Sequence, residues 1–145
     1  MLKINRDDFE LLRCHSEQSY PHECCGVLVG SVKDGQRQVH YVVRCLNTRT
    51  DSPHNRFAIE PRELVKILRE ARERGLDIIG FYHSHPDHPA RWSSTDYDEA
   101  HWIGCCYVIT AVANGKADQT SAFLLLGDAE ETKRFADEAL IVEDF

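Results

Sequence analysis

Residues 80–86 are Gly80-Phe81-Tyr82-His83-Ser84-His85-Pro86, the end of an apolar run with two histidines two residues apart. Side chains of an extended strand alternate between its two faces, so His83 and His85 point the same way. Both imidazoles can therefore bind one metal ion. Asp96 can supply a third, anionic ligand if the chain folds back. Three protein ligands with one open coordination position are typical of a catalytic zinc, whereas structural zinc sites have four.

Ser93 stands three residues before Asp96, and this spacing has a second, purely structural interpretation. The pattern S-x-x-D is also typical of a helix N-terminus, with Ser93 as the N-cap and Asp96 at the third helical position. In that case both side chains would bind only backbone N–H groups. The combination with the two histidines and with a suitably placed glutamate favours a metal site.

That glutamate is Glu23, at the start of the apolar run 24–32, which has the pattern of a buried strand. A carboxylate is costly to bury without a partner. Glu23 is therefore either a solvated residue at the start of the strand or a general base beside a metal-bound water.

Taken together, these residues resemble the motif of the JAMM (MPN) zinc metalloproteases. In that family a glutamate of an early strand precedes H-x-H and then S-x-x-D; the matching residues here are Glu23, His83, His85, Ser93 and Asp96. The short bacterial members are the most similar, because their segments P-x-E-x-C-G-x-L-x-G and G-x-Y-H-S-H-P match 21–30 and 80–86. Two departures are the second cysteine after Glu23 and Trp92, where many bacterial relatives have proline.

The resemblance implies a zinc ion held by His83, His85 and Asp96, with a water in the open position whose pKa the metal lowers to about 7. Glu23 would take a proton from this water and deliver it to the leaving amine. Ser93 would donate a hydrogen bond to the developing oxyanion, and one such donor contributes about 2.7–4 kcal/mol. His88 follows Pro86 and is expected to line the mouth of the site rather than to bind the metal.

The implied reaction is cleavage of an amide bond after the C-terminal tail of a ubiquitin-like protein or of a sulfur-carrier protein that ends in Gly-Gly. Such a tail can bind as an added strand at a sheet edge. The short chain leaves little room for the insertions with which larger relatives hold ubiquitin chains, which favours a sulfur carrier or a bacterial ubiquitin-like protein. The alternative is a non-catalytic scaffold of the MPN type.

Composition limits the remaining possibilities. A length of 145 residues predicts a single domain, 1–145. The formal net charge of −7 argues against nucleic acid as the main partner, and neither a signal-peptide pattern nor a membrane-spanning apolar run is found. The six cysteines form no C-x-x-C pair, so free thiols in the cytoplasm are expected. Cys24 and Cys25 have no assigned role beyond that of small buried hydrophobes.

Hydrophobic patterns predict helices at 6–19, at 61–74 and from Ser93 or Ser94 to about His101, and strands at 24–32, 38–46, 57–59, 77–85, 107–113 and 121–126. After Gly127 the pattern is helical at first, and 140–142 is compatible with a strand. Hairpin signals such as Asp34-Gly35 favour an α/β protein of the α+β type, with a curved, mixed, largely antiparallel sheet flanked by helices. The resemblance implies the same fold, with a cytidine deaminase-like architecture; the deaminase motifs H-x-E and P-C-x-x-C are missing, so that activity is not expected.

Overall fold

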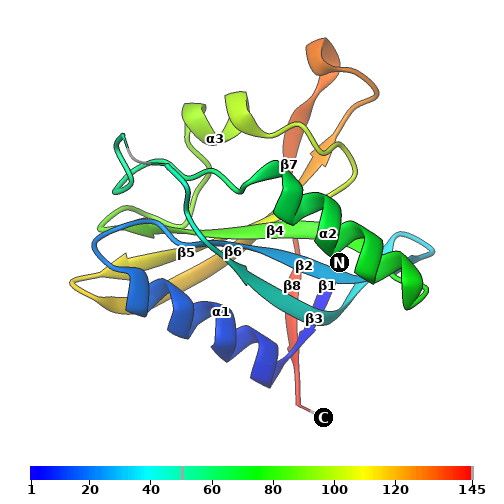
Figure 1. Ribbon diagram of the computed structural model, residues 1–145, viewed down its shortest axis with the longest axis horizontal. Coiled ribbons are helices and arrows are strands. Elements are labelled where there is room, and N and C mark those ends of the chain that lie inside the picture. The colour runs from blue at the N-terminus through cyan, green and yellow to red at the C-terminus, as the bar shows by residue number, and fades with distance from the viewer. Residues whose placement is uncertain (50, 145) are drawn as a thin grey trace.

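An eight-stranded curved sheet with helices on both faces forms the body of the protein (Figure 1). The computed structural model describes residues 1–49 and 51–144. The strands are β1 (Leu2–Asn5), β2 (Cys25–Lys33), β3 (Gln36–Cys45), β4 (Asp77–Pro86), β5 (Cys106–Ala113), β6 (Lys116–Leu126), β7 (Arg134–Glu138) and β8 (Leu140–Glu143). The helices are α1 (Arg6–Ser19), α2 (Pro61–Glu73) and α3 (Ser94–Glu99), with a 3₁₀ turn, η1 (Glu130–Thr132).

The strand order is β7-β6-β5-β4-β2-β3-β1-β8. Within the described ranges, four neighbouring pairs are antiparallel, and three pairs, β1–β3, β1–β8 and β4–β5, are parallel. β7 and β8 stand at opposite ends of this order although Ala139 alone separates them in the sequence. The sheet therefore curves until its two ends nearly meet. The expected α+β fold with a curved, mixed sheet is confirmed.

Both faces of the central strands are buried, because α1 packs on one face and α2 on the other (Figure 1). On β4, Phe81 belongs to the cluster that includes Ile67 of α2, whereas Tyr82 belongs to the cluster that includes Leu12 of α1. This alternation follows from the two-residue repeat of a strand. It places His83 and His85 on the same face as Phe81, the face that α2 covers.

The two long helices begin and end at residues suited to these positions. Asn5 caps α1 by accepting a hydrogen bond from the N–H of Asp8, at 2.7 Å. Pro61 opens α2, and Gly75 follows its end with a positive φ of 73°. The predicted helix 6–19 is thus confirmed, and the helix predicted at 61–74 ends one residue earlier. None of the described helices combines the length and the apolar character needed to cross a membrane.

Three local predictions were wrong. The segment 57–59 is extended but lies outside the sheet, because Ala58 binds the side chain of Asn47 and the N–H of Thr48 instead of a neighbouring strand. α3 ends at Glu99 and not near His101, since Ala100 is already extended. After Gly127 the chain forms only the short turn η1 before β7 pairs with the edge of β6.

Gly26 lies opposite Tyr82 in the β2–β4 ladder, and a Cβ at this position would overlap the phenol ring. The hydroxyl of Tyr82 lies 2.7 Å from Nδ1 of His15 on α1, so the ring has little freedom to move away. We expect Gly26→Ala to lower the free energy of unfolding by about 1–3 kcal/mol, as overpacking of a core does. Urea unfolding measures this, with Val32→Ala at an exposed position of the same strand as the control. Equal stability of the two variants would contradict this account of Gly26.

Candidate metal centre

Three side chains from two elements meet at one point. His83 and His85 lie at the C-terminal end of β4, and Asp96 lies in the first turn of α3. The two Nε2 atoms are 3.2 Å apart, Nε2 of His83 is 3.2 Å from Oδ1 of Asp96, and Nε2 of His85 is 3.0 Å from Oδ2. One potential ligand atom from each residue lies within 4.8 Å of the other two. The structure therefore brings together the three residues that the sequence nominated as metal ligands.

The backbone holds the histidines firmly, because β4 pairs with β2 on one side and with β5 on the other. His83 is 2% exposed and His85 is 7% exposed. His85 Nδ1 lies 2.9 Å from the carbonyl oxygen of Pro89. A carbonyl can only accept, so Nδ1 carries a proton, and in the neutral ring Nε2 presents its lone pair to the site. The ring of Phe57 stacks on His83, with ring centroids 4.6 Å apart.

Asp96 is oriented by the start of its own helix. The N–H of Ser93 donates to Oδ2 of Asp96 at 2.9 Å, and the N–H of Asp96 donates to Oγ of Ser93 at 3.1 Å. Ser93 is therefore a helix cap, as the structural interpretation of S-x-x-D predicted. Oγ acts as an acceptor in this bond, so the hydroxyl proton of Ser93 is still able to serve as a donor. The capping arrangement and a metal site are thus compatible.

The pKa shifts favour an ionised Asp96 and a neutral His83 at this centre. Burial lowers the pKa of His83, which keeps its imidazole neutral. Burial opposes ionisation of Asp96, but the two imidazoles and the N–H of Ser93 outweigh this effect and hold the pKa of Asp96 well below its usual range. Burial also opposes protonation of His85, but Asp96 raises the pKa of His85 above its ordinary value. Two nitrogen donors and one carboxylate are a ligand set that zinc accepts.

Glu23 is buried beside this group and has no hydrogen-bond partner for Oε1 among the described residues. Its side chain is 4% exposed, which excludes the solvated alternative. Burial raises the pKa of Glu23 to about 8; His85 lowers it, and Asp96 and Glu99 raise it further. A carboxyl group with a pKa near neutrality can both accept and deliver a proton.

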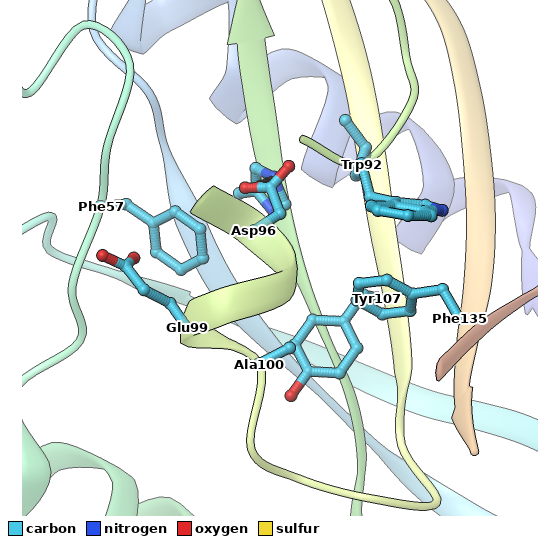
Figure 2. Close-up of a pocket in the computed structure, with 9 residues that line it drawn as sticks. Phe57, Trp92, Asp96, Glu99, Ala100, Tyr107 and Phe135 are labelled. Carbon is cyan, nitrogen blue, oxygen red and sulfur yellow. Dashed lines mark ion pairs between the residues drawn. The ribbon is translucent and has the colours of Figure 1, made fainter. Parts of the chain in front are cut away.

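Two hollows border the centre. One is a groove of about 330 Å³ whose lining contains Glu23, Asn55, His85, His88, Pro89, Arg91, Trp92, Ser93 and Thr95. His88 thus lines the groove and is not in the ligand group. The other lies behind α3, where Figure 2 shows Asp96 and Glu99 near the rings of Phe57, Trp92, Tyr107 and Phe135. The second, apolar hollow borders His83 and Asp96, whereas the groove, most of whose lining side chains are polar, gives access to Glu23 and Ser93.

Asn47 is a structural residue of the site that sequence reasoning missed. Its amide nitrogen donates to the carbonyl oxygens of Glu23 and Arg56, and its amide oxygen accepts from the N–H groups of Arg49 and Ala58. The N–H of Glu23 in turn donates to the carbonyl oxygen of Pro53, at 2.8 Å. Asparagine in a polar loop predicts a local turn, but the sequence contains no sign of the long-range bond to Glu23.

Residues 6–125 match the prokaryotic homologs of the JAB domain. The chain belongs to this family. The resemblance to the JAMM (MPN) proteins is thereby confirmed.

Several named proteins are similar over part of the chain. It is 35% identical to the desampylase of Haloferax volcanii over 61% of this chain and 62% of that protein. It is 32% identical to the probable TtuB-protein conjugate cleaving protease of Thermus thermophilus, over 70% of this chain and 65% of that protein. It is 32% identical to the Lys-63-specific deubiquitinase BRCC36 of Xenopus tropicalis, over 63% of this chain and 36% of that protein. The chain thus spans less than two thirds of the length of these relatives.

Two solved structures match almost completely. A protein of Desulfitobacterium hafniense has a TM-score of 0.82 at 27% identity, covering 100% of this chain and 94% of that chain. A protein of Salinibacter ruber has a TM-score of 0.72 at 36% identity, covering 98% and 92%. The whole described fold, including the strands after residue 125, therefore has counterparts in known structures.

The raised pKa of Glu23 predicts a pH dependence of stability in protein treated with a chelator. The unfolded chain releases this proton near 4.5 and the folded chain near 8, so between these values the folded state binds more protons. The free energy of unfolding should therefore fall as pH rises from about 5 to 8. One pKa unit corresponds to about 1.4 kcal/mol, so the loss should reach a few kcal/mol.

Glu23→Gln is the matched control, because glutamine does not titrate. Urea unfolding of both proteins at several pH values gives a difference curve in which the contributions of Asp96 and the histidines largely cancel. Parallel stability curves for the two proteins would show that Glu23 titrates normally.

Proposed function

We propose that this protein is a zinc-dependent peptidase or isopeptidase that cleaves the amide bond after the C-terminal tail of a ubiquitin-like or sulfur-carrier protein. The main support is the meeting of His83, His85 and Asp96 beside the buried carboxyl of Glu23. The names of three relatives, a desampylase, a conjugate cleaving protease and a deubiquitinase, support the same class of reaction. A non-catalytic scaffold would need neither the assembled ligands nor a buried carboxyl group.

The proposed metal ligands are His83, His85 and Asp96, and zinc is the metal that suits their nitrogen and oxygen donors. When bound, zinc supplies Lewis acidity and makes a water molecule acidic near neutral pH. The hydrogen bond from His85 to Pro89 fixes the tautomer in which Nε2 can bind. A cation in the centre would also lower the pKa of Glu23 from about 8 toward neutrality, since a positive charge favours the ionised carboxylate.

Glu23 and Ser93 are the proposed catalytic residues. The carboxylate of Glu23 would hold the proton removed from the attacking water and pass it to the departing amine. The hydroxyl of Ser93 would donate a hydrogen bond to the carbonyl oxygen of the scissile amide as negative charge develops there. Both residues line the same groove, so one bound peptide can contact both.

The tail of the substrate would bind on the other side of α3. An apolar groove of about 330 Å³ there is lined partly by Phe57, Ile59 and Trp102. The extended segment 57–59 has backbone groups outside the sheet, and an extended Gly-Gly tail can add to such a segment. The leaving amine would then lie in the polar groove with Glu23. A partner of the ubiquitin-like or sulfur-carrier class supplies a tail of this kind.

The decisive experiment compares metal content with hydrolysis. Zinc-loaded protein is expected to bind about one zinc per chain and to cleave a panel of conjugates that carry Gly-Gly tails. His83→Ala should lose both zinc and hydrolysis, whereas Glu23→Gln should keep zinc and lose at least about 10²-fold in kcat, because glutamine cannot transfer the proton. Elemental analysis and single-turnover assays provide the two measurements.

Different results would revise different parts of the proposal. Loss of zinc in Glu23→Gln would make Glu23 a ligand, and full activity in this variant would remove it from the mechanism. A zinc-loaded parent protein that cleaves none of the conjugates would contradict the proposed substrate class.

Ser93 combines a structural contact with a proposed catalytic one, and two substitutions separate them. Ser93→Ala should cost about 0.5–2 kcal/mol of stability through loss of the cap and lower kcat by about 10²–10³ through loss of the donor. Ser93→Asn should keep parental stability, because asparagine is a good N-cap, yet should be catalytically poor. Thermal melts and single-turnover kinetics on the same preparations measure both effects. Parental turnover in Ser93→Asn would assign Ser93 to the cap alone.

A further inference from the structure

α3 is a short helix that positions one of the three residues of the proposed metal centre. It contains six residues, none of which is buried, and yet it presents Asp96 to the two histidines. An isolated helix of this length is unstable in water, so contacts with other elements must fix its position. The capping arrangement of Ser93 and Asp96 is internal to this segment and orders its first turn without anchoring it to the sheet. On one side of α3, an anchor is the ion pair between Arg56 and Glu99, at 2.9 Å.

The opposite anchor is a buried lysine from the C-terminal part of the chain. The side chain of Lys133 is 2% exposed, and its Nζ donates to the carbonyl oxygen of Ala100 at 2.9 Å, directly after the last turn of α3. Nζ also lies 4.7 Å from the centre of the Tyr97 ring and 2.5 Å from the carboxylate of Glu130. Lysine is rarely fully buried unless its charge is paired. Here the charge is paired with Glu130, and the remaining contacts of the ammonium group are the Tyr97 ring of α3 and the carbonyl of Ala100.

Hydrogen bonds between α3 and the segment around Lys133 are donated from both sides. The hydroxyl of Tyr97, on α3, donates to the carbonyl oxygen of Lys133 at 2.7 Å. Just beyond, Nδ1 of His101 lies 2.9 Å from the carboxylate of Glu130. Phe135, two residues after Lys133, packs near the ring of Trp92 in the hollow behind α3 (Figure 2). The match to the family ends at residue 125, so this support comes from a part of the chain beyond it.

We infer that Lys133 is a positioning residue for Asp96. Its ammonium group holds the end of α3, and through this short helix it keeps the carboxylate within reach of both imidazoles. The inference rests on the proposed role of Asp96 as a metal ligand. Without the ammonium group, the carbonyl of Ala100 loses its donor and α3 can tilt away from β4, which leaves the two histidines to bind the metal without their anionic partner.

Lys133→Met tests this directly, because methionine keeps much of the apolar stem and removes the charge. We expect folded Lys133→Met to bind zinc about tenfold more weakly than the parent, which corresponds to about 1.4 kcal/mol. Competition with a chromophoric chelator measures the affinity without any substrate, and thermal melts verify that the variant is folded. Lys116→Met, at an exposed position at the start of β6, is the matched control and should keep parental affinity.

A double-mutant cycle separates positioning from general damage. If Lys133 acts through Asp96, Lys133→Met should have no further effect on the residual zinc affinity of Asp96→Asn. An equal loss in both backgrounds, or parental affinity in the folded single variant, would overturn the inference. Should Lys133→Met fail to fold, Tyr97→Phe replaces it in the cycle: this variant keeps the ring beneath Nζ and removes the bond to the Lys133 carbonyl, so we expect about threefold weaker binding.

A failure of the inference about Lys133 can be distinguished from a failure of the proposed function. A parent protein that binds zinc but cleaves no conjugate would contradict the proposed substrate and leave the effect of Lys133 on zinc affinity intact. A parent that binds no zinc would remove the basis of both.

Discussion

Two imidazole nitrogens and a carboxylate meet in the interior of this protein, and the rest of the site depends on keeping them together. Lone pairs only 3.2 Å apart repel each other unless a proton or a cation lies between them. The strand pairing around β4 fixes two of the three donors, and the third reaches them only because the chain turns back after Pro86. The surrounding burial strengthens each charge effect, including the one that keeps Glu23 protonated near neutral pH.

Each half of the proposed ligand set could be predicted from the sequence because its geometry is local: the two-residue spacing puts His83 and His85 on one face of a strand, and S-x-x-D is typical of a helix cap. That the two halves meet followed only from the family motif, because it depends on the turn of the chain after Pro86. Glu23 needed the family motif as well, since its own surroundings in the sequence favoured a solvated residue at a strand start. The buried environment of Glu23 depends on contacts with Asn47 and Pro53, which no pattern in the sequence connects to it.

The same difference between local patterns and long-range contacts decided which parts of the fold could be predicted. Helices with clear caps, such as α1 and α2, and most strands within apolar runs were predicted to within two residues, but β6 begins five residues before its predicted start and β1 was not predicted. Segments whose structure depends on distant partners were not: 57–59 binds Asn47, and β7 forms because the edge of β6 is open to it. Lys133 belongs with these segments. A lysine after Thr132 gives no sign in the sequence of being buried against a helix more than thirty residues earlier.

The proposed ligands are divided between a central strand and a short helix, and the fold holds these two elements differently. β4 is hydrogen-bonded on both sides and should be among the last elements to exchange its amide protons, whereas α3 has few backbone bonds and no buried residue. The two histidines are therefore held by the sheet, whereas the position of Asp96 depends on the side-chain contacts of α3 with Arg56 and Lys133. Any local opening of the centre would begin at α3 while β4 stays paired.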